Sequence, residues 1–302
     1  MDYKKIVRSQ KLRFRILDML SWVPDSLMLR LQYRIKMGFW PNFKHPRRFT
    51  EKLQLYKAKY RNPVMTQCVD KYEVRKYVES NGLGSLLNEL YGVYDSPDII
   101  EFGTLPKQFV VKTTDGGGGL NVIVVKDKNL VDFEKIRQDL ISWGAGTERR
   151  KKKSGGREWA YDGIRKRRII IEKYLEDSQS ADGNLTDYKL MFFNGRFRSL
   201  WIDKDRYTDH HRGFWDENLN FLPDVYSDHD TFKTPPALPE SIQEMILAGE
   251  KLSSDFPYAR IDFYDVDGKV VFGEITFYPW SGYVKFTPDE FDMTLGSYFT
   301  EY

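Results

Sequence analysis

The chain has 302 residues, a formal net charge of +3 and a single cysteine, Cys68. Hydrophobic residues make up 41% of it and aromatic residues 15%, which excludes a disordered chain and indicates a globular protein of one large domain or a few lobes. One cysteine excludes an internal disulfide, no apolar run approaches the ~20 residues of a membrane span, and the mixed charges of residues 1–20 are unlike a signal peptide.

Residues 3–37 predict two helices separated at Pro24, each with apolar residues at helical spacing and a basic stripe beside them. The first helix carries Leu12, Ile16, Met19, Leu20 and Val23 with Lys4, Arg8, Lys11 and Arg15, and the second carries Leu27, Met28, Leu31 and Ile35 with Arg30 and Arg34. One interpretation is a helical hairpin packed on the body of the protein. The other is a surface, residues 4–35, that meets anionic lipid.

Two further helices and a strand are expected before residue 105. Thr50 begins a helix with Glu51 in its first turn, where a carboxylate is favourable. A second helix is predicted over residues 65–81 and a strand over residues 86–94.

Residues 109–125 predict a strand, a glycine loop and a second strand. Lys112 lies near the end of the first strand, and Gly116, Gly117, Gly118 and Gly119 follow it. Successive glycines allow backbone N–H groups to turn toward an anion, and the lysine adds positive charge, which suits a nucleoside triphosphate. The order differs from the usual phosphate loop, in which the lysine follows the glycines. The alternative is a simple hairpin tip.

A helix over residues 132–143 precedes a basic stretch, residues 144–168, which is either a solvated loop or a binding edge for phosphate or an acidic polymer. No nucleic-acid-binding motif accompanies it. A buried strand follows at Ile169, then a hairpin over residues 187–201 on an Asn-Gly turn. Little periodicity is visible over residues 207–239, and a helix is expected over residues 239–254.

The last informative stretch, residues 258–279, predicts a hairpin with converging charges. Strand alternation places Arg260 and Asp262 on one face, and Glu274 and Thr276 likewise share a face. A three-residue loop, Val266–Gly268, would set Arg260 opposite Glu274. Two carboxylates on one patch suit magnesium, and the alternative is a salt-bridged sheet face.

Taken together, these residues resemble the ATP-grasp superfamily, most closely the TupA-like ATP-grasp proteins of polysaccharide biosynthesis. The resemblance covers roughly residues 45–285. The segments that carry it, in order, are Glu51-Lys52-Leu53, Asp70-Lys71-Tyr72, Phe109 to Lys112, Ile170 to Leu175, Asp187-Tyr188-Lys189 and Gly273 to Pro279.

The resemblance implies an α+β, ATP-grasp fold in which two α+β lobes clasp ATP. Four segments are then expected: an N-terminal helical extension, a segment preceding the ATP-grasp fold, an N-lobe with the glycine loop and a C-lobe with the metal site. Their bounds are 1–48, 49–105, 106–172 and 173–302.

The same resemblance implies roles for single residues. Lys71 and Lys112 would contact phosphates, and the glycine loop would close over them. An interlobe hinge of Glu172, Lys173, Tyr174 and Leu175 would hold adenine. Lys189 would be a further contact to phosphate or adenine. Arg260 would steady the transferred phosphoryl group, and Asp262 and Glu274 would hold magnesium. Thr276 stands where the superfamily usually has an asparagine ligand, which weakens the expectation of a second metal ion.

The activity implied is that of a cytoplasmic carboxylate–amine ligase that uses ATP and Mg²⁺. Its expected substrates are a uronic acid of a bacterial surface saccharide and an amino acid or other small amine. Two alternatives stay open at this point. One is a glycosyltransferase, for which Asp203-Lys204-Asp205 and Asp265-Val266-Asp267 supply D-x-D patterns. The other is a non-catalytic protein that binds nucleotide or saccharide.

Overall fold

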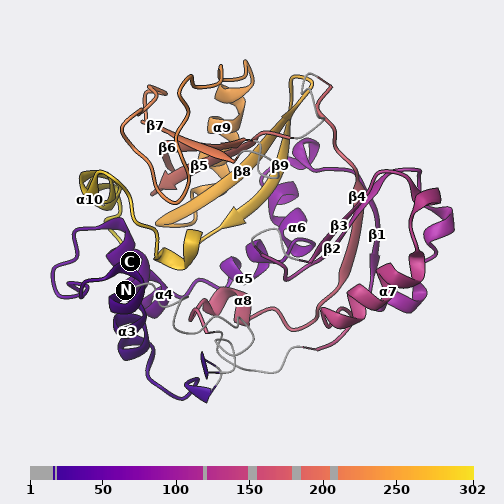
Figure 1. Cartoon of the computed structure of the whole chain (residues 1–302), viewed down its shortest axis with the longest axis horizontal. Helices are drawn as coiled ribbons and strands as arrows, with labels where there is room; N and C mark the ends of the chain where they lie inside the picture. Colours follow the sequence, from indigo (N-terminus) through magenta and orange to yellow (C-terminus); the bar gives the residue numbers. More distant parts are fainter. Residues whose placement is uncertain (1–15, 18, 118–120, 149–154, 179–184, 205–209) are drawn as a thin grey trace. The chain divides into compact units, whose positions relative to one another are not determined.

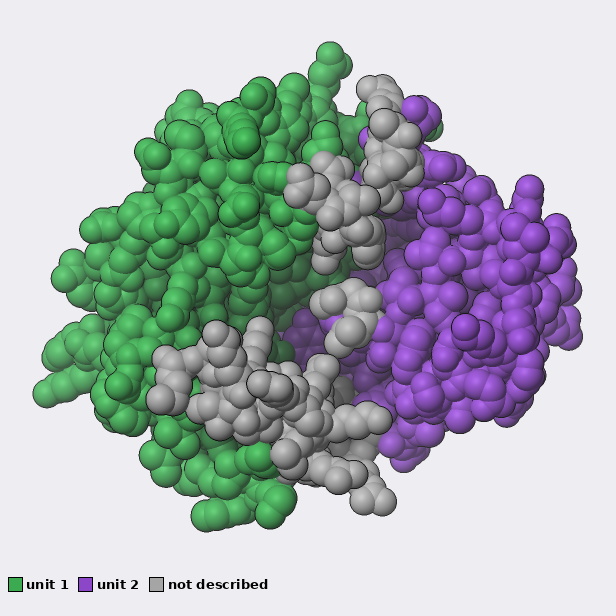
Figure 2. Space-filling view, in the orientation of Figure 1, with its two compact units in different colours: residues 1–62, 153–159, 186–302 green, residues 63–152, 160–185 purple. Residues whose placement is uncertain are grey.

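The computed structural model describes residues 16–17, 19–117, 121–148, 155–178, 185–204 and 210–302. The chain divides into two compact units, which Figure 2 colours separately. Unit 1 consists of residues 1–62, 153–159 and 186–302, and unit 2 consists of residues 63–152 and 160–185. Each unit contains its own antiparallel sheet together with helices, so the predicted α+β fold class is confirmed.

A four-stranded antiparallel sheet organises unit 2, with strand order β1-β4-β2-β3 (Figure 1). Its strands are β1 (Leu90–Tyr94), β2 (Phe109–Thr113), β3 (Val122–Val125) and β4 (Ile169–Lys173). Its helices are α5 (Val64–Val69), α6 (Glu73–Ser80) and α7 (Phe133–Ser142), with short 3₁₀ turns η1 (Gly84–Leu86), η2 (Pro97–Ile99), η3 (Phe102–Thr104) and η4 (Lys128–Leu130). The short helix α8 (Trp159–Asp162) begins in the residue range of unit 1 and ends in that of unit 2.

One face of this sheet is apolar and packed. Val111 of β2 pairs with Ile171 of β4, and both belong to a core cluster that includes Ile136 and Leu140 of α7. Because side chains alternate along a strand, the residues next to Val111 and Ile171 point to the other face. Lys112 is one of those residues, and its position is therefore set by the packing of the core face.

The single helix predicted over residues 65–81 is wrong, because the chain forms two short helices there, α5 and α6. Asp70 lies between them, and its Oδ1 accepts hydrogen bonds from the N–H groups of Tyr72 at 2.9 Å and Glu73 at 3.0 Å. A short side chain that accepts such hydrogen bonds favours the start of a new helix, α6, over the continuation of α5. The break also lets the Lys71 N–H donate to the carbonyl of Thr114 at 3.0 Å, which ties Lys71 to the end of β2.

Unit 1 is built around a five-stranded antiparallel sheet of order β7-β6-β5-β8-β9 (Figure 1). Its strands are β5 (Asp187–Phe193), β6 (Arg196–Lys204), β7 (His211–Trp215), β8 (Tyr258–Val266) and β9 (Lys269–Thr276). Its helices are α3 (Asp25–Met37), α4 (Phe49–Lys59), α9 (Ile242–Ser253) and α10 (Asp289–Tyr298), with the 3₁₀ turn η5 (Pro279–Gly282). The predicted Asn194-Gly195 turn joins β5 to β6, whereas β7 lies in a stretch where no strand was expected.

The two faces of this sheet differ in character. Helix α9 packs on one face so closely that a Cβ on Gly249 would lie 2.1 Å from the ring of Phe192. On the other face, one end is aromatic, where Tyr258 and Phe193 meet Phe49 of α4 with ring centroids 5.0 and 5.8 Å away. The remainder of that face is charged, and it is described with the functional site below.

The hairpin of β8 and β9 brings both carboxylates to one face as expected, but the predicted pairing of Arg260 with Glu274 is wrong. Arg260 lies opposite Thr276, and Asp262 lies opposite Glu274. The hairpin loop has two residues, Asp267-Gly268, so the predicted three-residue loop is wrong. A two-residue loop by itself would place Asp262 and Glu274 on opposite faces. A bulge at Gly273 shifts the register by one residue and makes Asp262 the partner of Glu274. A Cβ on Gly273 would lie 2.9 Å from the carbonyl oxygen of Asp262, which explains the glycine.

Helix α3 buries a different face from the one that its periodicity predicted. Its buried residues are Met28, Leu29, Gln32, Tyr33 and Met37. Of the predicted apolar stripe only Met28 is among them, whereas the other three members are exposed. The reason is that Tyr33 and Gln32 find polar partners inside the fold: the Tyr33 hydroxyl lies 2.9 Å from that of Thr50, and Gln32 Nε2 donates to the carbonyl of Gly155 at 2.8 Å. Residues 3–15 of the predicted first helix lie outside the described residues.

The four segments predicted with bounds 1–48, 49–105, 106–172 and 173–302 stay a prediction about domains. The compact units are divided at other residues, because β1, from the second segment, pairs with β4. The chain returns to unit 1 at residue 186.

Among the described residues, no helix combines the length and the apolar character that a bilayer crossing requires.

A buried carboxylate between α10 and α4 leads to a prediction about stability. Asp292 accepts hydrogen bonds from Thr50 N–H at 3.0 Å and Thr50 Oγ1 at 2.6 Å, and burial raises its pKa to about 7. The unfolded chain releases this proton near pH 4 and the folded protein near pH 7. The free energy of unfolding therefore falls by up to about 1.4 kcal/mol per pH unit between these values. Asp292→Asn is expected to flatten that slope in urea titrations from pH 4 to pH 8. An unchanged slope in the variant would show that Asp292 does not titrate in this range.

Candidate functional site

In unit 2, Lys112 and Glu172 are brought into direct contact although 60 residues separate them. Lys112 Nζ donates to Glu172 Oε2 at 2.8 Å, and Arg75 of α6 donates to Glu172 Oε1 at 3.3 Å. The side chain of Glu172 is 10% exposed and that of Lys112 is 29% exposed. An ammonium group has three donors, so Lys112 can keep Glu172 and still bind an anion from solvent.

The glycine loop is tied to the same region through Lys71. Lys71 Nζ donates to the carbonyl of Gly116, and Gly116 N–H donates to the carbonyl of Thr113 at 3.4 Å. A Cβ on Gly117 would meet no atom within 4 Å, which means that open space surrounds this residue. Gly118 and Gly119 lie outside the described residues. Lys71, Lys112 and the described part of the loop thus belong to one region of unit 2.

The four residues of the predicted hinge, Glu172 to Leu175, belong to unit 2, and their role as an interlobe hinge stays a prediction. The backbone of Lys173 is already bonded, because its N–H donates to the carbonyl of Glu89 at 2.9 Å and its carbonyl accepts from Asn88 Nδ2 at 2.9 Å. Tyr174 and Leu175 follow the end of β4 and are half-buried. The ammonium of Lys126 lies 5.7 Å from the ring centroid of Tyr174.

The basic stretch before β4 has a structural role where it is described. Arg167 pairs with Asp115 at 2.7 Å, and Arg168 pairs with Glu73 at 2.7 Å. Neither the predicted solvated loop nor the predicted anion-binding edge describes these two arginines. The basic run of residues 149–153 lies outside the described residues.

In unit 1, Arg260 and Asp262 form the centre of the charged sheet face. Arg260 Nε donates to Asp262 Oδ1 at 2.6 Å, and Arg260 Nη2 donates to Asp262 Oδ2 at 2.7 Å. The contact is a bidentate salt bridge. Lys189 of β5 donates to the same Oδ2 at 3.0 Å. All three side chains are buried, so each charge depends on the others for compensation.

Glu274 and Thr276 of β9 complete this centre from the neighbouring strand. Arg260 Nη2 donates to Glu274 Oε1 at 2.9 Å and to Thr276 Oγ1 at 3.0 Å. Thr276 Oγ1 in turn donates to Glu274 Oε1 at 3.0 Å. The side chain of Glu274 is 39% exposed and that of Asp262 is 3% exposed, so Glu274 is the carboxylate that solvent reaches.

Electrostatic interactions keep the two cations of this face, Lys189 and Arg260, charged in spite of their burial. Burial works to lower the pKa of Lys189, but Asp187 and Asp262 outweigh that effect and the pKa is raised. The pKa of Arg260 is likewise raised, since Asp262 and Glu274 outweigh its burial. Burial raises the pKa of Asp262, although Arg260 and Lys189 oppose that rise. The face therefore presents fixed positive charges next to acidic oxygens.

The charged face extends further than the sequence analysis predicted. Asp187 binds Lys189 at 2.7 Å, and Asp203 of β6 accepts from Arg212 Nε of β7 at 2.6 Å. Burial alone would raise the pKa of Asp203, but Arg212 and Lys189 hold it well below its ordinary value. The signal in the sequence was the alternation of charged residues along β5 and β6, as in Asp187-Tyr188-Lys189.

Aromatic rings line the same face. Trp201 and Trp280 stack with centroids 4.4 Å apart. The guanidinium of Arg260 lies 5.0 Å from the Trp201 ring and that of Arg212 lies 5.1 Å from the Trp280 ring. Such contacts hold both arginines in place as well as offsetting their charge.

In each D-x-D pattern the first aspartate is bound by other groups of the protein. Asp203 binds Arg212 and also His210 Nε2 at 3.0 Å, whereas Asp205 lies outside the described residues. Asp265 accepts from the Gly268 N–H at 2.8 Å and from the hydroxyl of Ser241, which makes it part of the β8–β9 turn. The first aspartate of each pattern therefore has structural partners, which counts against its use as the metal ligand of a glycosyltransferase.

Asp262 and Glu274 would hold magnesium only together with ligands from outside the protein, such as phosphate oxygens and water. Asp262 and Glu274 both bind one nitrogen of Arg260, so their oxygens converge on the same point. Among the described residues, no group of three or more acidic, histidine or cysteine side chains is placed to hold a metal. Magnesium commonly takes one or two carboxylates and completes its shell with phosphate oxygens and water. Two carboxylates are what this face provides.

Comparison with known proteins agrees with these features. The sequence model of a family described as TupA-like ATP-grasp matches residues 51–300. The chain belongs to the TupA-like ATP-grasp family. No curated protein matches the chain. With this membership, the predicted family and the ATP-grasp fold are confirmed.

Solved structures give more distant similarities to this TupA-like ATP-grasp chain. They include a D-alanine–D-alanine ligase from Bacillus anthracis, with 18% identity, a TM-score of 0.43, and coverage of 70% of this chain and 57% of that one. A D-alanine–D-alanine ligase from Helicobacter pylori has 19% identity and a TM-score of 0.41, and the match covers 78% of this chain and 61% of that one. An N5-carboxyaminoimidazole synthetase from Staphylococcus aureus, complexed with ADP, has 16% identity and a TM-score of 0.41, and the match covers 75% of this chain and 50% of that one. The chain thus spans between 50% and 61% of the length of these three structures.

One segment that carries the TupA-like ATP-grasp resemblance, Glu51-Lys52-Leu53, has a structural role. Glu51 accepts hydrogen bonds from the N–H groups of Asn42, Arg47 and Arg48 at 2.8–3.2 Å and so fixes the start of α4. Lys52 Nζ donates to the carbonyls of Gly296 and Phe299, both at 2.8 Å, which fixes the end of α10.

Proposed function

We propose that this chain is an ATP-dependent carboxylate–amine ligase that joins an amino acid or small amine to a uronic acid of a bacterial surface polysaccharide. The observation that carries the proposal is the match to the TupA-like ATP-grasp family over residues 51–300. The substrate class rests on the resemblance to TupA-like proteins of polysaccharide biosynthesis. The charged residues of both units support the reaction type.

In this proposal, unit 2 binds the phosphates of ATP. Lys112 and Lys71 supply positive charge, and both are held by acceptors of the same unit, Glu172 and the Gly116 carbonyl. The held lysines need little reorganisation when a phosphate arrives, which is the condition for strong electrostatic stabilisation. Glu172, with Lys173, Tyr174 and Leu175, is proposed to contact adenine.

The charged face of unit 1 would serve the transfer itself. Arg260 and Lys189 keep fixed positions through Asp262, so their charge is available where negative charge develops on the phosphoryl group. Magnesium, held by Asp262 and Glu274, would supply further neutralisation of phosphate charge. Thr276 would then orient Glu274 through their hydrogen bond.

The reaction proposed has two steps. A carboxylate oxygen of the uronic acid attacks the γ-phosphorus of ATP, the bond to the β-phosphate oxygen breaks, and ADP leaves. The amine nitrogen then attacks the carbonyl carbon of the acyl phosphate, phosphate leaves, and the nitrogen loses a proton to give the amide. Positioning and charge neutralisation are the protein's part in both steps.

The test uses hydroxylamine to intercept the acyl phosphate. The purified protein is incubated with ATP, magnesium, hydroxylamine and a panel of uronic-acid saccharides. We expect a hydroxamate, with one ADP and one phosphate released for each. Glu274→Gln is expected to raise the magnesium concentration needed, while Glu244→Gln, on the exposed surface of α9, serves as the matched control. Release of AMP and pyrophosphate, or release of UDP from a UDP-sugar with ATP untouched, would overturn the proposal.

A further inference from the structure

Exposed apolar side chains concentrate near the start of the chain. Of the large hydrophobic residues of unit 1 that the structure describes as exposed, all but Tyr226 and Leu247 lie within residues 16–40. They are Ile16, Met19, Trp22, Leu27, Leu31, Ile35, Phe39 and Trp40. Single exposed apolar residues are ordinary, but a contiguous group marks an interaction surface.

Helix α3 has apolar residues on two sides, and only one side is used by the fold. Leu29 and Met37 are buried, whereas Leu27, Leu31 and Ile35 are 59%, 44% and 45% exposed. Their spacing of four residues places these three in one row along the helix. Trp22 precedes α3 and Trp40 follows it, with 79% and 58% of their surfaces exposed.

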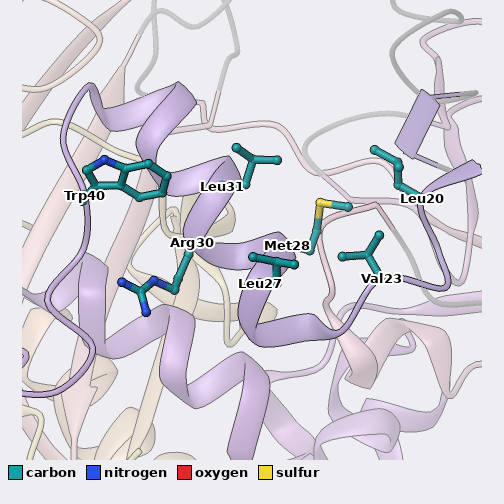
Figure 3. A pocket seen from close by; sticks show the side chains of 7 residues that line it. All are labelled: Leu20, Val23, Leu27, Met28, Arg30, Leu31 and Trp40. Carbon is teal, nitrogen blue, oxygen red and sulfur yellow. The ribbon is translucent and has the colours of Figure 1, made fainter.

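A shallow apolar cavity of about 630 Å³ adjoins this row. Figure 3 shows it: Leu20 and Val23 lie on one side of it, Leu27 and Leu31 on α3, and Trp40 beyond the helix. Arg30 is the one charged residue among its lining residues in the described part of the chain.

The described stretch that contains the row is basic. Residues 19–48 contain six lysine and arginine residues and one aspartate, in a chain whose net charge is only +3. Arg30 and Arg34 are exposed beside the apolar row, and Lys44 and Arg47 are exposed after it. An apolar row with tryptophans at its ends and basic residues alongside matches the chemistry of an anionic membrane surface.

We infer that the exposed side of α3, with Trp22 and Trp40, docks on an anionic lipid bilayer. Leu27, Leu31 and Ile35 would enter the boundary between headgroups and acyl chains, and Arg30 and Arg34 would contact lipid phosphates. The inference rests on exposure and charge in unit 1 and does not depend on the reaction proposed above. Binding would be peripheral and sensitive to salt.

Vesicle sedimentation tests the inference with the full chain. We expect the protein to sediment with vesicles that contain about 30% phosphatidylglycerol, to bind pure phosphatidylcholine at least roughly 10-fold more weakly, and to be released by high salt. No sedimentation with anionic vesicles at low salt would overturn the inference.

Matched variants locate the contact. The double variant Leu31→Ser, Ile35→Ser and the double variant Arg30→Gln, Arg34→Gln are each expected to reduce vesicle binding at least about 10-fold. Leu247→Ser and Lys251→Gln, at exposed positions of α9, should bind as the wild type does. All these positions are exposed, and equal melting temperatures will confirm that each variant is folded. Equal binding by all variants would overturn the inference.

Bromine-labelled acyl chains give a second readout, because they quench tryptophan fluorescence only at short range. Quenching is expected in the wild type and should fall when Trp22 and Trp40 are both replaced by phenylalanine. If sedimentation velocity instead shows a dimer that Leu31→Ser, Ile35→Ser dissociates, and vesicles cause no quenching, the surface contacts a second copy of the chain and the lipid inference fails.

Discussion

Replacing Lys112 by alanine is expected to lower ATP-dependent turnover by about 10²- to 10³-fold, the usual cost of removing one group that stabilises developing charge. Lys112 is 29% exposed and its partner Glu172 keeps Arg75 at 3.3 Å, so the substitution does not leave the carboxylate without a cation. The melting temperature should therefore change little. Turnover and thermal unfolding, measured on the same preparation, separate a functional loss from a structural one.

Lys107→Ala is the matched control for this variant. Lys107 is 69% exposed and pairs with Asp127 at 3.2 Å on the surface, where an ion pair contributes little. Wild-type turnover is expected in that variant. If Lys112→Ala also kept wild-type turnover, phosphate binding by Lys112 would be excluded. If Lys112→Ala unfolded, its contact with Glu172 would have to be a structural requirement.

Replacing Arg260 by methionine is expected to affect both stability and activity. Methionine keeps much of the volume, but Asp262 and Glu274 lose the guanidinium that both of them bind. Removing one member of a buried ion pair costs about 3–5 kcal/mol, because the remaining charge stays buried without compensation. Urea unfolding should show that loss, and ATP-dependent turnover should fall by at least about 10²-fold.

A second substitution distinguishes the charge effect from a packing effect. In the double variant Arg260→Met, Asp262→Asn the unpaired carboxylate is gone, so part of the lost stability is expected to return while activity stays low. Arg196→Met, at an exposed position of β6, is the control and should match the wild type. A double variant less stable than Arg260→Met alone would contradict this explanation. It would show that the unpaired Asp262 carboxylate is not the cause of the lost stability.

Local patterns predicted several elements of this fold correctly. Apolar, β-branched runs on both sides of the glycines predicted β2 and β3, and Asn194-Gly195 predicted the turn between β5 and β6. These features depend on residues close together in the chain. By contrast, β7 was not predicted. It lies in a stretch without hydrophobic periodicity, and its pairing with β6 identifies it as a strand.

For the candidate site, the sequence by itself determined which residue types share a strand face: Arg260 with Asp262, and Glu274 with Thr276. Alternation along a strand needs no partner. Only the tertiary structure decided that the two pairs meet, because the two-residue loop would separate them and the bulge at Gly273 restores the register. Pairing across the sheet also decided the partners of Lys189 and the contact of Lys112 with Glu172. The same holds for α3, where buried hydrogen bonds of Gln32 and Tyr33, rather than apolar periodicity, select the side that packs.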